Sequence, residues 1–156
     1  MRTYVLERSL VIARPRDEVF PFFADAHNLE RLTPPFLRFR ILTPGPIEMR
    51  PGARIDYEIR LRGIPIRWRT VIDAWEPPHR FVDRQVRGPY RKWIHEHRFE
   101  EVAGGTRCID RIEYAVPGGP VIERIVHRLV VGPDVARIFD YRAQEMVRAF
   151  ETRANA

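Results

Sequence analysis

Hydrophobic and charged residues alternate along much of this chain, which is the pattern of β-strands with one buried and one exposed face. The clearest case covers residues 54–61, Arg-Ile-Asp-Tyr-Glu-Ile-Arg-Leu, where every second residue is apolar. The same period of two recurs between turns rich in proline and glycine. It predicts seven strands, at residues 4–13, 36–42, 54–61, 66–75, 81–87, 90–102 and 107–116.

Two parts of the chain have the spacing of helices instead. Pro15 opens a short helix with a heavily apolar side, and a second short helix is predicted at residues 27–32, before Thr33-Pro34-Pro35. Beyond Pro120, apolar residues recur every three or four positions, with an expected kink at Gly132-Pro133. The apolar stripe of this C-terminal helix is expected to lie on the inner face of an antiparallel sheet, in an α+β fold. The members of that stripe are Val121, Ile122, Ile125, Val126, Leu129, Val130, Val135, Ile138, Phe139, Met146 and Phe150.

The run Trp-Ile-His-Glu-His-Arg-Phe at residues 93–99 is the most informative segment for function. Alternation places four of its side chains on one face, namely Trp93, His95, His97 and Phe99. Charged residues occupy most of the opposite face, which we expect to be exposed to solvent. The face with the two imidazoles is therefore predicted to be the wall of a pocket.

The register of this strand can be predicted from the glycines after it. Gly104-Gly105 is a typical two-residue hairpin turn, which would make residues 107–116 the partner strand. Ala103 would then pair with Thr106. The cross-strand pairs expected on the histidine face are Phe99 with Asp110, His97 with Ile112, His95 with Tyr114 and Trp93 with Val116.

Two histidines spaced two apart on one strand can present both imidazoles to a metal ion. The predicted register leaves the third-ligand candidates Asp110 and Cys108 too far from both rings, so we expect no metal and no cofactor. Hydrogen bonds inside a partly polar cavity, or contact with a ligand, are the alternatives. An acid–base role is also open, with His95 as base, Tyr114 as phenolic donor and Asp110 as the orienting acid.

Arg142 lies on the inner stripe of the predicted C-terminal helix, where a guanidinium needs a partner. If Asp110 or Asp83 neutralises it, its role is structural. If neither does, Arg142 could read an acidic group on an otherwise apolar ligand.

Composition narrows the class of protein. The 156 residues suffice for one domain, expected to span residues 1–156. The net charge of +6 comes from arginines, with Lys92 the single lysine, and acids are interleaved throughout, so we expect no nucleic-acid partner. A single cysteine, Cys108, fits a reducing compartment, and without an apolar leader or membrane-length segment we expect a cytoplasmic protein. Oligomeric state stays open.

Several segments resemble the START-like, polyketide cyclase/dehydrase and lipid-transport superfamily, also described as Bet v 1-like. The segments are Glu-Arg-Ser-Leu at 7–10, Arg-Pro-Arg-Asp-Glu-Val-Phe-Pro-Phe-Phe-Ala-Asp at 14–25, Leu-Thr-Pro-Pro at 32–35, Trp-Glu-Pro-Pro-His-Arg-Phe at 75–81 and the run at 93–99. The resemblance covers essentially the whole chain and is strongest to a bacterial branch. It implies a helix-grip fold, with a curved antiparallel sheet wrapped around the C-terminal helix and two short helices between the first two strands.

The resemblance also implies a hydrophobic small molecule held between sheet and helix, by a carrier or sensor. The residues expected to contact it are Tyr57, Trp68, Trp93, His95, His97, Phe99, Ile112, Tyr114, Phe139 and Arg142. Members of the superfamily share no single catalytic set. Two other hypotheses therefore stay open: a cyclase or dehydratase that uses His95 and Tyr114, and a protein-interaction module with a filled cavity.

Overall fold

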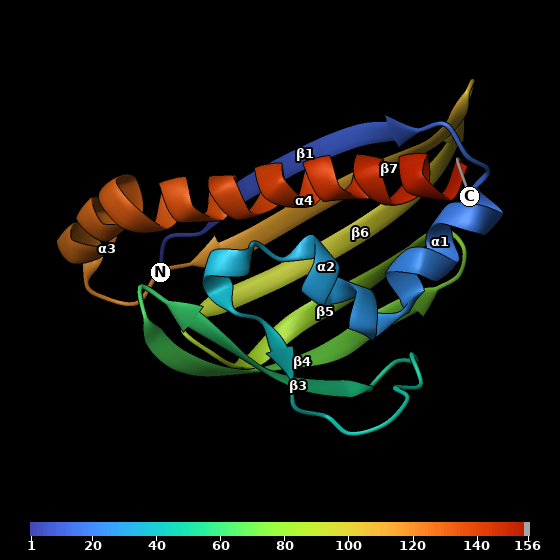
Figure 1. The fold of residues 1–156 in the computed structure, drawn as a ribbon. Helices are drawn as coiled ribbons and strands as arrows, with labels where there is room; N and C mark the ends of the chain where they lie inside the picture. Colours follow the sequence, from blue (N-terminus) through green and yellow to red (C-terminus); the bar gives the residue numbers. More distant parts are fainter. Residues whose placement is uncertain (155–156) are drawn as a thin grey trace.

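A computed structural model of the chain describes residues 1–154. A single antiparallel sheet of seven strands, in the order β1-β7-β6-β5-β4-β3-β2, curves around one long helix (Figure 1). The strands are β1 (Tyr4–Ile12), β2 (Arg40–Ile41), β3 (Arg54–Leu61), β4 (Ile64–Glu76), β5 (Arg80–Arg87), β6 (Lys92–Val102) and β7 (Gly105–Ala115).

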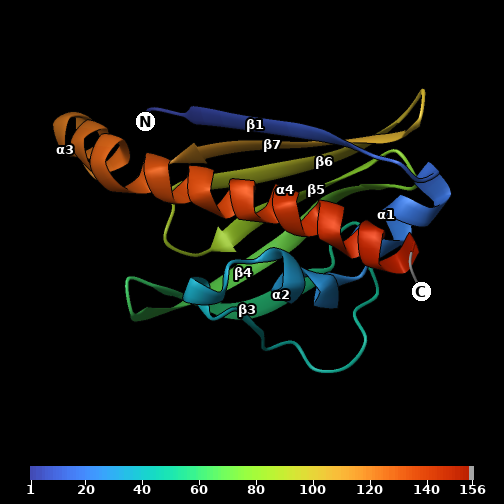
Figure 2. The same cartoon turned by 45° about the horizontal axis from the view of Figure 1, so that its top comes forward.

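The helices lie on one side of this sheet. Between β1 and β2 the chain forms α1 (Arg16–Ala24), η1 (Ala26–Asn28), α2 (Leu29–Leu32) and η2 (Pro35–Leu37). After β7 come α3 (Pro120–Val126), the π-helical turn η3 (His127–Val131) and α4 (Gly132–Ala154). Figure 2 shows α4 running along the concave face of the sheet while α3 projects past its end. The predicted helix-grip architecture is confirmed, with short helices between the first two strands.

The strand predicted at residues 36–42 is wrong over most of its length. Residues 35–37 form a turn of 3₁₀-helix, and Arg38 adopts a left-handed backbone conformation with φ of 45°. Neither conformation fits an extended strand. Only Arg40 and Ile41 pair with β3.

The expected break in the C-terminal helix is present, but a π-turn forms it. The Gly132 amide donates to the carbonyl of His127, five residues earlier. A side chain at Gly132 would place its Cβ 2.9 Å from that carbonyl oxygen, so glycine suits the turn. Before and within the turn, the prediction for the apolar stripe is wrong: Val121, Ile122, Ile125 and Leu129 point to solvent rather than to the sheet.

The β6–β7 register differs from the prediction by two residues. Val102 pairs with Gly105, so the turn is Ala103-Gly104, with Gly104 at a φ of 87°. Gly105 is the first residue of β7, and the Ile12 carbonyl of β1 passes so close that a Cβ there would meet its oxygen at 2.0 Å, so only glycine fits. A two-residue shift keeps every side chain on its predicted face but changes its partner.

The shifted register pairs opposite charges on the outer face and places an acid beside the histidines. Glu96 lies opposite Arg111 and Glu100 opposite Arg107, where the predicted register had set Glu96 against another glutamate. On the inner face, Asp110 lies opposite His97 rather than Phe99.

Two apolar clusters fill the space between sheet and helices. One joins the α1 phenylalanines to the far end of α4, with Phe20, Phe22, Phe23, Phe81, Phe99, Met146 and Phe150 among its members. The other surrounds the start of α4 and includes Trp68, Trp93, Ile112, Tyr114, Val135 and Phe139. Along β6, His95 and His97 lie between Trp93 of one cluster and Phe99 of the other. No helix in the described part of the chain is long and apolar enough to cross a membrane.

The sheet–helix core predicts a contrast between two isoleucines of β7. Ile112 is fully buried on the inner face, so Ile112→Ala should lower the free energy of unfolding in urea by about 3 kcal/mol. Ile109 lies on the outer face of the same strand and is only partly buried, so Ile109→Ala should cost about 1 kcal/mol or less. Equal losses would contradict the assignment of the inner face as the core.

Candidate functional site

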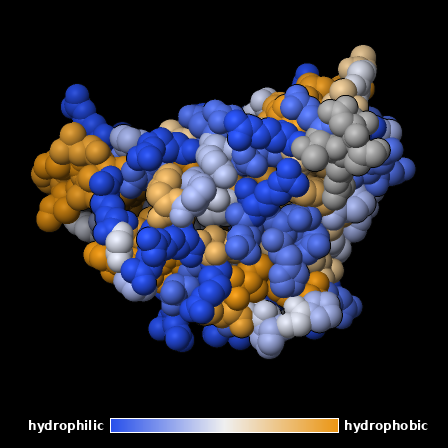
Figure 3. Space-filling view, viewed as in Figure 1, coloured by the Kyte–Doolittle hydropathy of each residue, from blue (hydrophilic) through white to orange (hydrophobic). Residues whose placement is uncertain are grey.

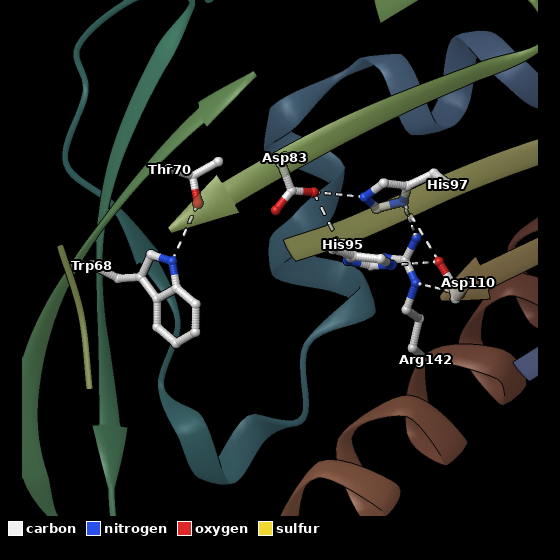
Figure 4. Close-up of polar contacts among 7 residues, drawn as sticks. All are labelled: Trp68, Thr70, Asp83, His95, His97, Asp110 and Arg142. Carbon is white, nitrogen blue, oxygen red and sulfur yellow. Dashed lines mark hydrogen bonds and ion pairs between the residues drawn. The ribbon is translucent and has the colours of Figure 1, made fainter. Parts of the chain in front are cut away.

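A cavity lies between the sheet, α4 and the segment that contains α2. About 140 Å³ of it is open to water-sized molecules. Most of the lining is aromatic or aliphatic; the sheet and α4 contribute Asp83, His95, His97 and Arg142 at its polar end (Figure 4), and the helical segment contributes Asp25, Asn28 and Thr33. The lining side chains include Leu37, Tyr57, Trp68, Thr70, Asp83, Tyr90, Trp93, His95, His97, Ile138, Phe139 and Arg142.

Aromatic rings from four neighbouring strands or turns form the apolar wall. Tyr57 stacks on Trp68 with ring centroids 5.7 Å apart, and Trp68 meets Trp93 edge to face at 5.3 Å. Tyr90 packs against Trp93 at 4.8 Å. The Trp68 indole nitrogen donates to the Thr70 hydroxyl at 3.2 Å, so this ring presents only apolar surface to the cavity.

Strand alternation and register bring the polar end together. On β5, Asp83 shares the inner face with Phe81, and it lies opposite His95 of β6. His97 lies opposite Asp110 of β7. Arg142 reaches the same place from α4, so three strands and the helix each contribute side chains (Figure 4). We call Asp83, His95, His97, Asp110 and Arg142 the polar cluster.

His97 is held on both of its ring nitrogens. Its Nε2 lies 2.6 Å from Asp83 Oδ2, and its Nδ1 lies 3.2 Å from Arg142 Nη2. A guanidinium can only donate, so Nδ1 accepts and the proton is on Nε2, which donates to Asp83. The ring is also sandwiched between Phe81, at a centroid distance of 4.0 Å, and His95, at 3.6 Å.

Asp110 joins the helix to the second histidine. Arg142 Nε donates to its Oδ2 at 2.9 Å, and His95 Nε2 donates to its Oδ1 at 2.8 Å. Of the two alternatives for Arg142, neutralisation within the fold or a free guanidinium, the structure shows the first, with Asp110 as the partner. His95 Nδ1 lies 3.8 Å from Asp83 Oδ2, beyond a hydrogen bond, and His95 and Asp83 both line the cavity.

The cluster keeps its acids ionised and one histidine neutral. Burial acts to raise the pKa of Asp110, but the charge of Arg142 and the His95 hydrogen bond hold it well below its usual range. The pKa of Asp83 is also lowered, because the His97 hydrogen bond and the nearby positive charges outweigh burial. Burial, reinforced by His95, lowers the pKa of His97 to about 4. At neutral pH the permanent cation Arg142 thus faces two carboxylates.

Asp83, His95 and His97 also offer metal-ligating atoms within 4.8 Å of one another. The third candidate ligand is therefore Asp83, rather than Asp110 or Cys108. In the structure the two imidazoles stack with their planes at 29° and their centroids 3.6 Å apart. His97 Nε2 already carries the proton donated to Asp83. The three side chains therefore form a hydrogen-bonded network whose atoms are also close enough together to be candidate metal ligands.

Seven of the ten predicted contact residues line the cavity: Tyr57, Trp68, Trp93, His95, His97, Phe139 and Arg142. Phe99, Ile112 and Tyr114 lie outside its lining. Phe99 packs among the phenylalanines of α1, and Ile112 is enclosed in the core. Tyr114 turns away because its hydroxyl bonds His127 Nε2 at 2.8 Å. The predicted trio of His95, Tyr114 and Asp110 is thus brought together only as the His95–Asp110 pair.

Sequence reasoning missed Asp83 and Tyr90 as cavity residues. Asp83 was available from the pattern, since it alternates with Phe81 and therefore shares its inner face. Tyr90 lies in the turn before β6, where no periodicity applies. The lining residues contributed by residues 23–49 were not predicted for the same reason, because their placement depends on tertiary packing.

The buried and exposed arginine–aspartate pairs predict different costs of removal. Arg142→Leu leaves Asp110 buried without its cation and should lower the free energy of unfolding by about 3–5 kcal/mol. The exposed pair Arg8–Asp140 has nearly the same length, 3.0 Å, yet Arg8→Leu should cost about 1 kcal/mol or less. Urea unfolding of both variants measures this, and similar losses would contradict the buried role of Arg142.

The lowered pKa of His97 predicts a loss of stability in mild acid. Between pH 6.5 and pH 4 the unfolded chain binds a proton at this residue while the folded chain does not, so acid favours unfolding. The difference corresponds to about 3 kcal/mol by pH 4. The glutamine in His97→Gln keeps a hydrogen-bond donor but does not titrate. The free energy of unfolding of this variant should therefore fall less between pH 6.5 and pH 4 than that of the wild type. Parallel pH profiles of wild type and variant would show that His97 is not the group responsible.

Solved structures of similar shape include two aromatase/cyclases. The di-domain aromatase/cyclase StfQ from the steffimycin biosynthetic pathway has a TM-score of 0.72 at 17% identity, covering 99% of this chain and 53% of that one. The ZhuI aromatase/cyclase from Streptomyces sp. R1128 has a TM-score of 0.66 at 16% identity, and the likeness covers 95% of this chain and 96% of that one. The structure of Ara h 8.0201 has a TM-score of 0.65 at 13% identity, covering 97% of this chain and 99% of that one. These likenesses show the fold.

None of the curated protein sequences matches the chain significantly. A family model does match, over residues 4–151, and its description is polyketide cyclase/dehydrase and lipid transport. The match covers the sheet, the polar cluster and nearly all of α4. The chain therefore belongs to the polyketide cyclase/dehydrase and lipid-transport family.

Proposed function

We propose that this protein binds a hydrophobic or amphipathic small molecule in the cavity between the sheet and α4, as a carrier or sensor. The observation that carries the proposal is an aromatic cavity that ends in a pre-arranged polar cluster. Apolar walls supply affinity in such sites, and a few fixed polar groups orient the ligand. Membership of a family described by cyclase, dehydrase and lipid-transport activities is in keeping with this role.

The size of the cavity limits the ligand. A volume near 140 Å³ is at the scale of engineered apolar cavities that accept benzene. Typical pockets for drug-sized ligands are about 300–1,000 Å³. A single ring fits the cavity as it stands, and a larger ligand requires lining side chains to move. The open volume favours small-molecule binding over an interaction module with a filled interior.

The polar end favours a hydroxyl group on the ligand. Asp83 accepts from His97 through Oδ2, and within the described chain no hydrogen bond occupies its Oδ1. An ionised carboxylate only accepts hydrogen bonds, so it selects a donor. A phenol or alcohol placed against Asp83, with its ring on the aromatic wall, satisfies both surfaces.

A second candidate function is acid–base catalysis of the cyclase or dehydratase type. The observation in its favour is the His95–Asp110 pair, in which a buried carboxylate orients an imidazole whose other nitrogen is free toward Asp83 and the cavity. The chemistry would rest on His95 with Asp110, since Tyr114 is engaged by His127. His95→Ala should then abolish turnover while phenol binding stays measurable; loss of both together would show only a damaged cavity.

Ligand binding predicts that filling the cavity abolishes it. Ile138 lines the cavity from α4, so Ile138→Trp should remove the binding of phenol measured by ligand-observed NMR. Val147 is exposed on the same helix, and Val147→Trp should bind phenol like the wild type. The proposal is overturned if wild type binds no phenol, or if the two variants behave alike.

The polar cluster predicts discrimination between phenol and benzene. Asp83→Asn keeps an oxygen for His97 but puts an NH2 donor in place of the oxygen that should receive the phenol hydroxyl. The affinity for phenol should fall by roughly tenfold, the scale of one charge-assisted hydrogen bond. Benzene makes no such bond, so its binding should change little. An equal loss of both ligands would place the effect in the cavity shape and contradict recognition by Asp83.

A further inference from the structure

The helix α3 and the π-turn η3 that follows it expose an unusual number of large apolar side chains. Their exposed fractions are 70% for Val121, 61% for Ile122, 53% for Ile125 and 69% for Leu129. Figure 3 shows a hydrophobic patch at the end of the molecule where α3 lies. Grouped apolar exposure of this kind marks an interaction surface.

Arginines flank the apolar residues. Val121, Ile125 and Leu129 succeed one another at intervals of four and form one row, and Arg124 and Arg128 form the row beside it. Both arginines are exposed. The single acidic residue among residues 120–131, Glu123, is buried on the opposite side. The free face of α3 therefore combines apolar and positive groups without a carboxylate.

The base of α3 is fixed, so the helix presents this face in a defined direction. The His127 ring stacks on Tyr4 with centroids 3.5 Å apart, and its Nε2 bonds the Tyr114 hydroxyl. Beyond this anchor α3 extends past the sheet (Figures 1 and 2). A salt bridge of 3.2 Å between Arg62 and Asp134 ties the β3–β4 turn to the start of α4, close to an exposed Ile64.

We propose that α3, together with Arg128 and Leu129 of η3, docks on the surface of a bilayer that contains anionic phospholipids. Val121, Ile125 and Leu129 enter the boundary between head groups and acyl chains, and Arg124 and Arg128 pair with lipid phosphates. Amphipathic helices with this division of side chains bind membranes through buried apolar area together with attraction to anionic lipids. The docking surface is separate from the cavity, so the proposal does not depend on the proposed function.

A second copy of the chain fits this face less well. A stable protein interface buries about 800 Å² on each partner, more than the exposed side of the two or three helical turns at residues 120–131 supplies. Self-pairing through α3 would also bring the Arg124 and Arg128 rows of two molecules together, which like-charge repulsion opposes. A lipid surface offers both an apolar layer and negative charge.

Sedimentation of the protein with vesicles tests the proposal. Wild type should bind vesicles of phosphatidylcholine with phosphatidylglycerol, bind phosphatidylcholine alone much more weakly, and lose affinity as salt is raised. Arg124→Gln with Arg128→Gln should weaken binding to the anionic vesicles by about thirtyfold. Ile125→Ser with Leu129→Ser should weaken it by roughly tenfold or more through lost apolar burial.

The matched control is Val11→Ser with Arg107→Gln. These two exposed residues pair across β1 and β7, near the β6–β7 turn and away from α3, and the change removes one apolar and one positive side chain. This control should bind like the wild type, and thermal unfolding should show all variants folded. Three results would overturn the proposal: no binding to either vesicle, equal binding by the α3 variants and wild type, or a dimer in light scattering that the α3 substitutions dissociate.

Discussion

The buried pair between Arg142 and Asp110 is the interaction on which the rest of the interior depends. It is the one place where a charged group of α4 reaches through the apolar packing to a charged group of the sheet among the described residues. Two charges removed from water are tolerated only with good geometry and further hydrogen bonds. His95 and His97 provide those bonds, and in doing so their rings become fixed.

This requirement explains why the cavity has its polar end where it does. The histidines separate two apolar clusters, one around the phenylalanines of α1 and one around Trp68 and Trp93. A continuous apolar core could have closed this space by side-chain packing. With hydrogen-bonded groups of fixed geometry in the middle, the aromatic side chains pack around them, and the remaining volume is lined by both, Asp83 and His95 included.

Much of the fold could be predicted from local patterns in the sequence. Period-two alternation placed β3 at its observed bounds, and the inner face of β6 was assigned correctly because a register shift of two leaves faces unchanged. The partners across the hairpin were not predictable, since Gly105 serves the strand and not the turn: it leaves room for the Ile12 carbonyl of β1, a contact between residues far apart in sequence. The same limit hid the engagement of Tyr114 by His127.

The candidate site shows the same division between local and tertiary information. The residues taken from strand alternation, such as Trp68, His95 and His97, line the cavity as predicted. The loop residues that close it, such as Tyr90 and Leu37, have no periodicity that could identify them. Burial of Ile112 by its neighbours is likewise a property of the packed core and not of its strand pattern.

The π-turn at His127–Val131 has a consequence for the phase of the C-terminal helix. An α-helix advances about 100° per residue, so one additional residue in a turn rotates α3 by that angle relative to α4. If the inner stripe of α4 continued without the turn, Arg124 and Arg128 would point at the sheet. With it, Glu123 and His127 point inward and the apolar side chains of α3 point outward. The insertion of a single backbone unit thus decides which chemistry this end of the molecule shows to its surroundings.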